Sequence, residues 1–316
     1  MPLHRTLSAA GAFWLAAFTY FIWGFTFLAS RIAQDYGTPF VLLFWRFALA
    51  FALLNLLRLT GRFPVRFRSR RLWPVLLAGL FEPVLYFPCE QYGLKLTSTS
   101  FSGVMVALIP LCSLVYGAIF LHEKATWRQV VFSVLSVAGV IVLAVYATGI
   151  GAGSFLGFLI LLGTVFAGAG YMVACRACSG SFTAFERTYI TCGMGAVAFG
   201  VLSVLEHRHD LSAVVLPMTH APFALAIVFL SVVASVLSYL ALNRALEVLP
   251  VARTAALINL STVVSVLAGV LLLREPFGWV SAAASAAILV GIWGVQRFAA
   301  PTVPDTAEST EPLPPS

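Results

Sequence analysis

Long apolar runs alternate with short polar connectors along almost the whole 316-residue chain. A helix of about 20 residues is about 30 Å long, which matches the hydrocarbon core of a bilayer. Ten runs of this kind predict ten membrane-spanning helices, at residues 12–30, 39–57, 73–93, 99–121, 127–146, 154–174, 184–205, 222–243, 251–273 and 277–297. We therefore expect an all-α integral membrane protein.

The composition supports this prediction, because 60% of the residues are hydrophobic and only 10% are charged. Soluble domains carry roughly 25% charged residues. The net charge of +7 does not indicate nucleic-acid binding, since the basic residues lie between the apolar runs instead of clustering on a soluble module. The segment 298–316 is rich in Pro, Thr, Ser and acidic residues, so we expect a disordered cytoplasmic tail.

The distribution of Lys and Arg predicts the orientation. If the N-terminus is cytoplasmic, 14 of the 19 basic residues fall in cytoplasmic segments or at the cytoplasmic ends of spans and 4 fall in external segments, with Arg46 alone deep inside a span. Basic residues favour the cytoplasmic side of membrane proteins. This bias predicts that both termini are cytoplasmic, which requires an even number of spans.

The sequence also contains an internal repeat. A shift of 152 residues aligns residues 94–139 with residues 246–291 without a gap. The most informative matches are Gly117 with Gly269, Glu123 with Glu275, Trp127 with Trp279 and Gly139 with Gly291. Each half, 12–146 and 154–297, then holds five spans. Because five is odd, the second half enters the membrane from the opposite side, the inverted repeat that many alternating-access transporters use.

The two matched glutamates, Glu123 and Glu275, each lie just before a predicted helix. A carboxylate is favoured there by the positive end of the helix dipole. We interpret both as architectural residues, with direct contact to a substrate as the alternative. A row of small residues, Ala283, Ala287 and Gly291, allows close helix packing in the fold or in a homodimer, and the sequence leaves both open.

Three ionisable side chains lie at membrane depth, where each costs about 2.5–3.5 kcal/mol on insertion scales. Glu82 lies about 14 Å from the cytoplasmic edge of the third span and Glu90 about 12 Å further along. Tyr86 lies between them on one helix face. Arg46 lies roughly 10 Å deep in the second span, at a depth between the two acids. Pro83, like Pro88 further on, removes a backbone N–H and favours a kink.

These groups predict a polar cavity for substrate or coupling ions. Burial disfavours a charged carboxylate whereas Arg46 favours it, so Glu82 is a candidate proton carrier. Instead of carrying a proton, Glu82 could bind the substrate or neutralise Arg46. Glu90 could likewise neutralise Arg46, or its side chain could extend to the outer surface. The second half offers neutral polar residues instead. We expect these and several aromatic residues to line the cavity: Trp23, Tyr171, Tyr239, Asn243 and Asn259.

Four stretches resemble the EamA-domain family of the drug/metabolite transporter superfamily. They are FIWGFTF (21–27), FWRFALA (44–50), ALIPLCSLVYGAIFLHE (107–123) and ALINLSTVVSVLAGVLLLREP (256–276). Pro110 matches the family pattern, whereas Thr262 replaces the proline expected opposite it. The resemblance covers residues 12–297. It implies a secondary carrier of amino acids, drug-like compounds or other small metabolites in the bacterial cytoplasmic membrane, with export favoured over import and protons as a possible coupling ion.

Other classes of protein fit less well. The sequence has no GxSG, HExxH or P-loop motif, and no aspartate falls inside a span, so we expect neither an enzyme nor a cofactor. Cys175 and Cys178 form a lone CxxC without a second pair, and the HRHD segment (207–210) is more typical of a solvated loop than of a metal site. A receptor or scaffold without transport and a channel remain the alternatives. The expected partners are lipid and a small-molecule substrate, with the protein as a monomer or homodimer.

Overall fold

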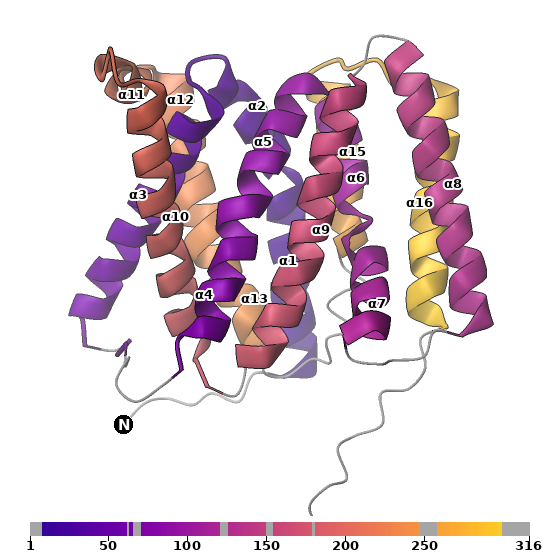
Figure 1. Ribbon diagram of the computed structural model, residues 1–316, viewed down its shortest axis with the longest axis horizontal. Coiled ribbons are helices and arrows are strands. Elements are labelled where there is room, and N and C mark those ends of the chain that lie inside the picture. Colours follow the sequence, from indigo (N-terminus) through magenta and orange to yellow (C-terminus); the bar gives the residue numbers. More distant parts are fainter. Residues whose placement is uncertain are drawn as a thin grey trace, which may run out of the picture.

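The computed structural model describes residues 8–61, 63–65, 71–120, 126–149, 154–178, 181–246 and 258–298. These residues form helices and contain no strand, so the predicted all-helical class is confirmed. The helices stand side by side with roughly parallel axes (Figure 1). Within the described residues, four helical stretches are long and apolar enough to cross a membrane: Ala10–Gln34, Pro39–Leu59, Ala184–Glu206 and Ala221–Leu242. The protein is therefore a multi-pass membrane protein.

Helices lie on each of the first five predicted ranges. They are α1 (Ala9–Gly24), α2 (Thr26–Gln34), α3 (Pro39–Leu59), α4 (Trp73–Gly79), the π-helix η1 (Leu80–Leu85), α5 (Tyr86–Leu96), α6 (Thr99–Val106), α7 (Ile109–Phe120) and α8 (Trp127–Gly149). The first, third and fourth ranges each contain a break in the helix. The prolines of the third range predicted its break, whereas the apolar pattern gave no sign of the breaks in the first and fourth.

The second half has the same character. Its elements are α9 (Phe155–Cys178), α10 (Ala184–Glu206), α11 (Ser212–Val215), the 3₁₀ helix η2 (Leu216–Thr219), α12 (Ala221–Val228), the π-helix η3 (Phe229–Leu237), α13 (Ser238–Leu246), α15 (Ile258–Leu272) and α16 (Trp279–Arg297). Residues 251–257 of the ninth predicted span and residues 299–316 of the predicted tail lie outside the described residues. Phe298, which we assigned to the tail, instead closes the last turn of α16 and stacks on Phe132 at 5.5 Å.

Local sequence signals explain several helix ends. Thr183 and Glu186 form a capping box at the start of α10, where each side chain accepts from the other residue's backbone N–H. Pro39 occupies the first turn of α3, where the missing N–H costs nothing. These signals position the ends of the helices, whereas the breaks within them depend on contacts between distant segments.

Many helix pairs consist of one helix from each half of the chain. Two contacts join helices that the 152-residue shift makes equivalent: α8 with α16, and α3 with α10. A further contact between the halves joins α6 to α15, which the same shift aligns with α7. Two other contacts form a matching set, because α5 of the first half packs on α9 of the second, and α13 of the second half packs on α1 of the first. Figure 1 shows α8 and α16 side by side at one edge of the bundle.

The α8–α16 contact shows this exchange at the level of atoms. A Cβ on Gly139 would lie 2.9 Å from the Ala284 carbonyl oxygen, and a Cβ on Gly291 would lie 2.7 Å from the Phe132 carbonyl oxygen. The shift of 152 residues converts each contact into the other. Gly291 therefore serves close packing within the chain, whereas Ala283, from the same small-residue row, is exposed.

Candidate functional site

Glu82 lies where the third helical range loses its regular backbone. Its φ of −142° and ψ of 113° are non-helical, inside the π-helix η1. Pro83 follows and supplies no N–H to the helix ladder. Irregular backbone at membrane depth is tolerated only where it is buried in protein or lines a wet cavity. The break thus coincides with an ionisable side chain, Glu82, within a predicted membrane span.

The second half has its own π-helix at the matching position, η3. The N–H of Ser238 bonds to the Val233 carbonyl, although a regular α-helix would pair it with Ala234. The released Ala234 carbonyl instead accepts a hydrogen bond of 3.0 Å from the indole N–H of Trp23. Since the 152-residue shift aligns Ala234 with Glu82, both halves carry an irregular backbone at equivalent positions of the sequence repeat.

Aromatic residues from different helices surround the Glu82 carboxylate. The Tyr239 hydroxyl donates a hydrogen bond to Glu82 Oε1. The Tyr239 ring packs against Trp23 with 5.1 Å between centroids, and Trp23 packs edge-on against Tyr20 at 5.4 Å. Tyr171 lies within electrostatic range of Tyr239. The predicted residues Glu82, Tyr239, Trp23 and Tyr171 are therefore brought together from four distant parts of the sequence.

Arg46 is only 3% exposed and lies against the same region. Its Nε donates to Ser235 Oγ at 3.1 Å, and Ser235 in turn donates to the Leu230 carbonyl. The guanidinium carbon is 4.4 Å from the ring centroid of Phe87 and 5.5 Å from that of Phe47. The Nη1 atom is buried without a hydrogen-bond partner.

Arg46 interacts electrostatically with both glutamates but is not fixed to either of them by an ion pair. Both Glu82 and Glu90 lie within electrostatic range of Arg46. In the part of the chain that the structure describes, however, Arg46 forms no direct ion pair with either carboxylate. Each carboxylate accepts its hydrogen bond from a neutral donor instead, Glu82 from Tyr239 and Glu90 from Gln91.

Glu90 belongs to a second polar network, nearer the end of α5. The Gln91 Nε2 donates to Glu90 Oε2 at 3.0 Å and to Ser30 Oγ at 3.2 Å. Gln34 then donates to Gln91 Oε1 at 3.0 Å. Glu90 is 5% exposed, so the alternative in which its side chain extends to the surface is wrong. The network ties α2 to α5.

Other predicted cavity residues have mixed outcomes. Tyr86 is buried, one helical turn from Glu90. Its ring packs against Gly168, where an added Cβ would lie 3.3 Å from the ring. The side chains of Asn243 and Asn259 lie outside the described part of the structure. Pro88 does not interrupt α5, which runs through it from Tyr86 to Leu96.

Sequence reasoning missed Ser235, Tyr20 and Gln91. Ser235 had a usable signal, because Ser231, Ser235 and Ser238 recur at helical spacing and give an apolar helix one polar stripe. Tyr20 and Gln91 had none beyond their position in a membrane span.

The repeat-equivalent residues have structural positions. The Glu275 carboxylate accepts from Thr99 N at 2.6 Å, from Ser100 N at 2.9 Å and from Ser100 Oγ at 2.8 Å. Glu275 thus caps α6 of the other half, and not the start of α16 as its position in the sequence suggested. Gly269 packs closely against both Glu275 and Ser100. Glu123 lies outside the described residues, as do the side chain of Pro110 and the surroundings of Gly117.

Trp127 and Trp279 mark the first residues of α8 and α16. They are 71% and 80% exposed. Tryptophans are enriched at the membrane–water interface, so these positions suit the ends of spanning helices.

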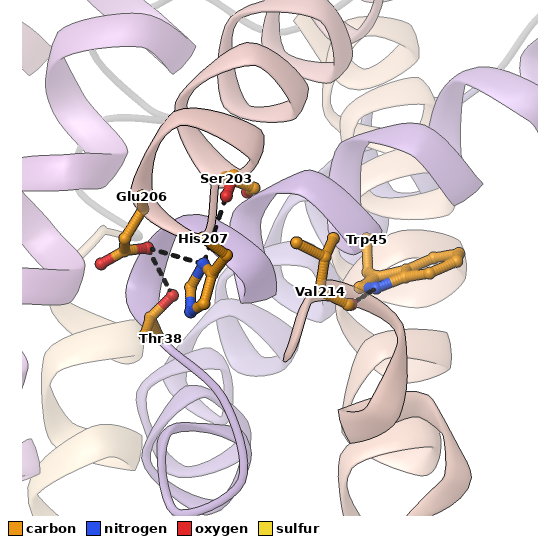
Figure 2. A network of polar contacts seen from close by, with 6 residues as sticks. All are labelled: Thr38, Trp45, Ser203, Glu206, His207 and Val214. Carbon is orange, nitrogen blue, oxygen red and sulfur yellow. Dashed lines mark hydrogen bonds and ion pairs between the residues drawn. The ribbon is translucent and has the colours of Figure 1, made fainter. Parts of the chain in front are cut away.

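A separate network lies at the start of α3 and the end of α10 (Figure 2). Thr38 donates to Glu206 at 2.6 Å, and His207 lies 3.7 Å from the same carboxylate oxygen. The Trp45 indole donates to the Val214 carbonyl at 2.8 Å. Among the described residues, no group of three side chains could hold a metal ion, and this includes the HRHD segment. The network fastens the connector after α10 onto α3.

The fold defines a multi-pass membrane protein with charged and polar side chains buried between its helices. A model of the EamA-like transporter family matches residues 10–145 and 155–297. The chain belongs to the EamA-like transporter family. This confirms the resemblance found in the sequence, and it points to transport as the role of the chain, not to catalysis.

Two relatives and one solved structure give further comparison. Uncharacterized transporter YcxC of Bacillus subtilis (strain 168) is 32% identical over 285 residues, which cover 89% of this chain and 91% of that protein. An uncharacterized transporter of Archaeoglobus fulgidus is 27% identical over 284 residues, covering 89% and 97%. A crystal structure matches with a TM-score of 0.62 at 21% identity, covering 92% of this chain and 98% of the other, and this likeness concerns the fold alone.

Proposed function

We propose that the protein is a secondary transporter that moves a small organic solute across the bacterial cytoplasmic membrane by alternating access. Coupling is to protons or another gradient, and export is favoured over import. The observation that carries this proposal is the hydrogen bond between Glu82, on the irregular segment η1 of the first half, and Tyr239, which lies at the start of α13 just after η3 in the second half. A contact of this kind changes when the halves move relative to each other.

The packing supports an inverted repeat as the basis of that movement. The reciprocal contacts of Gly139 and Gly291 relate α8 to α16 by an exchange of the halves. The basic residues support cytoplasmic termini. Inverted halves that pack around one site provide two equivalent arrangements, open to opposite sides.

Glu82 is the coupling residue in this proposal. Its carboxylate is half-buried at membrane depth, within range of Arg46, and it accepts a hydrogen bond from Tyr239. Burial favours the neutral acid, whereas the hydrogen bond and the cation favour the anion. Movement of the halves that changes these contacts would release or take up one proton.

The test uses purified protein in proteoliposomes with an imposed pH gradient and labelled solutes chosen from a growth screen of deletion and overexpression strains. Glu82→Gln is expected to abolish proton-driven flux at normal protein abundance. Glu206→Gln, far from this site, is the control and retains flux. Undiminished proton-driven flux in Glu82→Gln would refute the coupling role. Absence of flux for every solute favours a receptor or scaffold, and flux that does not saturate favours a channel.

A further inference from the structure

We propose that Arg46 binds a carboxylate on the transported solute, an inference that rests on the transport function proposed above. The carboxylate would accept hydrogen bonds from the edge of the guanidinium that includes Nη1. Arg46 is then the residue that selects acids over otherwise identical amides or amines.

The geometry leaves one part of the guanidinium for a ligand. A guanidinium carries five N–H donors in a planar fork. Its Nε donates to Ser235, and the rings of Phe87 and Phe47 lie within cation–π distance. Nη1 is buried and has no hydrogen-bond partner. A buried cationic donor without an acceptor is costly, so an acceptor that arrives with the solute would remove this cost.

The internal acids have donors of their own. Glu82 accepts from Tyr239, and Glu90 accepts from Gln91. Because neither carboxylate makes a direct ion pair with Arg46 in the described part of the chain, the guanidinium is held in place by an uncharged hydroxyl and aromatic rings. Planar bidentate pairing with a carboxylate is the interaction that a guanidinium makes best.

The charges nearby restrict the solute further. Two carboxylates and one guanidinium lie within mutual electrostatic range. A solute that carries only negative charge would be repelled by both acids. The site therefore fits an amphoteric solute, whose carboxylate faces Arg46 and whose cationic group faces Glu82 or Glu90.

The test compares each of a panel of L-amino acids with its own primary amide. Binding is measured as ligand-dependent thermal stabilisation of the detergent-purified protein, and transport as counterflow in proteoliposomes. We expect at least one acid to bind wild-type protein tenfold or more tightly than its amide. If every acid binds no better than its amide, the inference is overturned. Flux of amines or amides without any preference for acids would overturn it while leaving the transport function intact.

Variants then assign the preference to Arg46. Arg46→Gln is expected to reduce the acid-to-amide ratio to about one. Ser235→Ala keeps the charge of Arg46 but removes the hydroxyl that orients the guanidinium, so we expect a smaller reduction in the acid-to-amide ratio. This variant decides the question if Arg46→Gln does not fold. Arg58→Gln is the matched control, because Arg58 lies on the same helix and donates to the Tyr189 hydroxyl at 3.2 Å. An unchanged ratio in Ser235→Ala and Arg46→Gln alike would contradict the assignment.

Discussion

Replacing Glu275 with glutamine removes one of the two oxygens that accept hydrogen bonds at the start of α6. In the native protein, Oε1 accepts from Thr99 N, and Oε2 accepts from both the N–H and the hydroxyl of Ser100. The glutamine side chain has a single carbonyl oxygen, and its amide nitrogen would face another donor. One buried N–H therefore loses its acceptor.

The expected cost follows from the burial of these groups. Thr99 and Ser100 are 0% and 2% exposed, so water does not replace the lost acceptor. An unsatisfied buried donor costs about 1–3 kcal/mol, and the lost charge at the helix N-terminus adds about 0.3–1 kcal/mol. We expect Glu275→Gln to reduce the free energy of unfolding by about 1–4 kcal/mol. Glu275→Ala, which leaves both N–H groups without an acceptor, is expected to cost more.

The assay is unfolding of the purified protein in detergent, followed by tryptophan fluorescence. Glu206→Gln is the control, because the Glu206 side chain is 30% exposed and its hydrogen bond from Thr38 lies at the surface, so it should contribute less than about 1 kcal/mol. If Glu275→Gln is as stable as Glu206→Gln, the capping explanation is wrong. Transport per folded molecule should change less than about twofold, since this role is architectural; a selective loss of transport at unchanged stability would instead favour contact with substrate.

Three further outcomes follow from the packing and the site. Gly291→Ala should destabilise the protein by about 1–3 kcal/mol, because the new Cβ meets backbone atoms, whereas Gly200→Ala, whose Cβ meets only an aromatic ring at 3.3 Å, should be neutral or stabilising in the same unfolding assay. Trp23→Phe leaves the Ala234 carbonyl without its donor, so a loss of about 1–3 kcal/mol is expected, and a stability equal to wild type would refute that bond. Tyr239→Phe removes the donor to Glu82 and should lower the initial rate of flux about tenfold at equal protein abundance, which corresponds to about 1.4 kcal/mol; an unchanged rate would count against the site.

The helices themselves could be predicted from the sequence, whereas their breaks could not. A span in a bilayer must satisfy its backbone hydrogen bonds internally, so its length and apolar composition are visible in any single segment. Pro83 signalled the irregular segment at Glu82, but Pro88 lies within the regular helix α5. The matching segment η3 contains no proline. Its released carbonyl is paired by Trp23, which is more than 200 residues away in the sequence.

The candidate site divides in the same way. The expense of a charge at membrane depth singled out Glu82, Glu90 and Arg46 without any structure, because few other side chains carry that cost. Their partners could not be found in this manner. Ser235, which holds Arg46, is an uncharged residue that a membrane helix tolerates at many positions.

The sequence by itself therefore determined the all-helical membrane class, the approximate positions of the described helices, the family and the charged residues of the candidate site, since each depends on composition or spacing along one stretch of chain. Only the tertiary structure decided that Glu82 bonds to Tyr239 and that Glu275 caps α6. Hydrogen bonds between distant segments depend on which helices become neighbours. That choice is made by close packing, as at Gly139 and Gly291, and no local pattern in the chain encodes it.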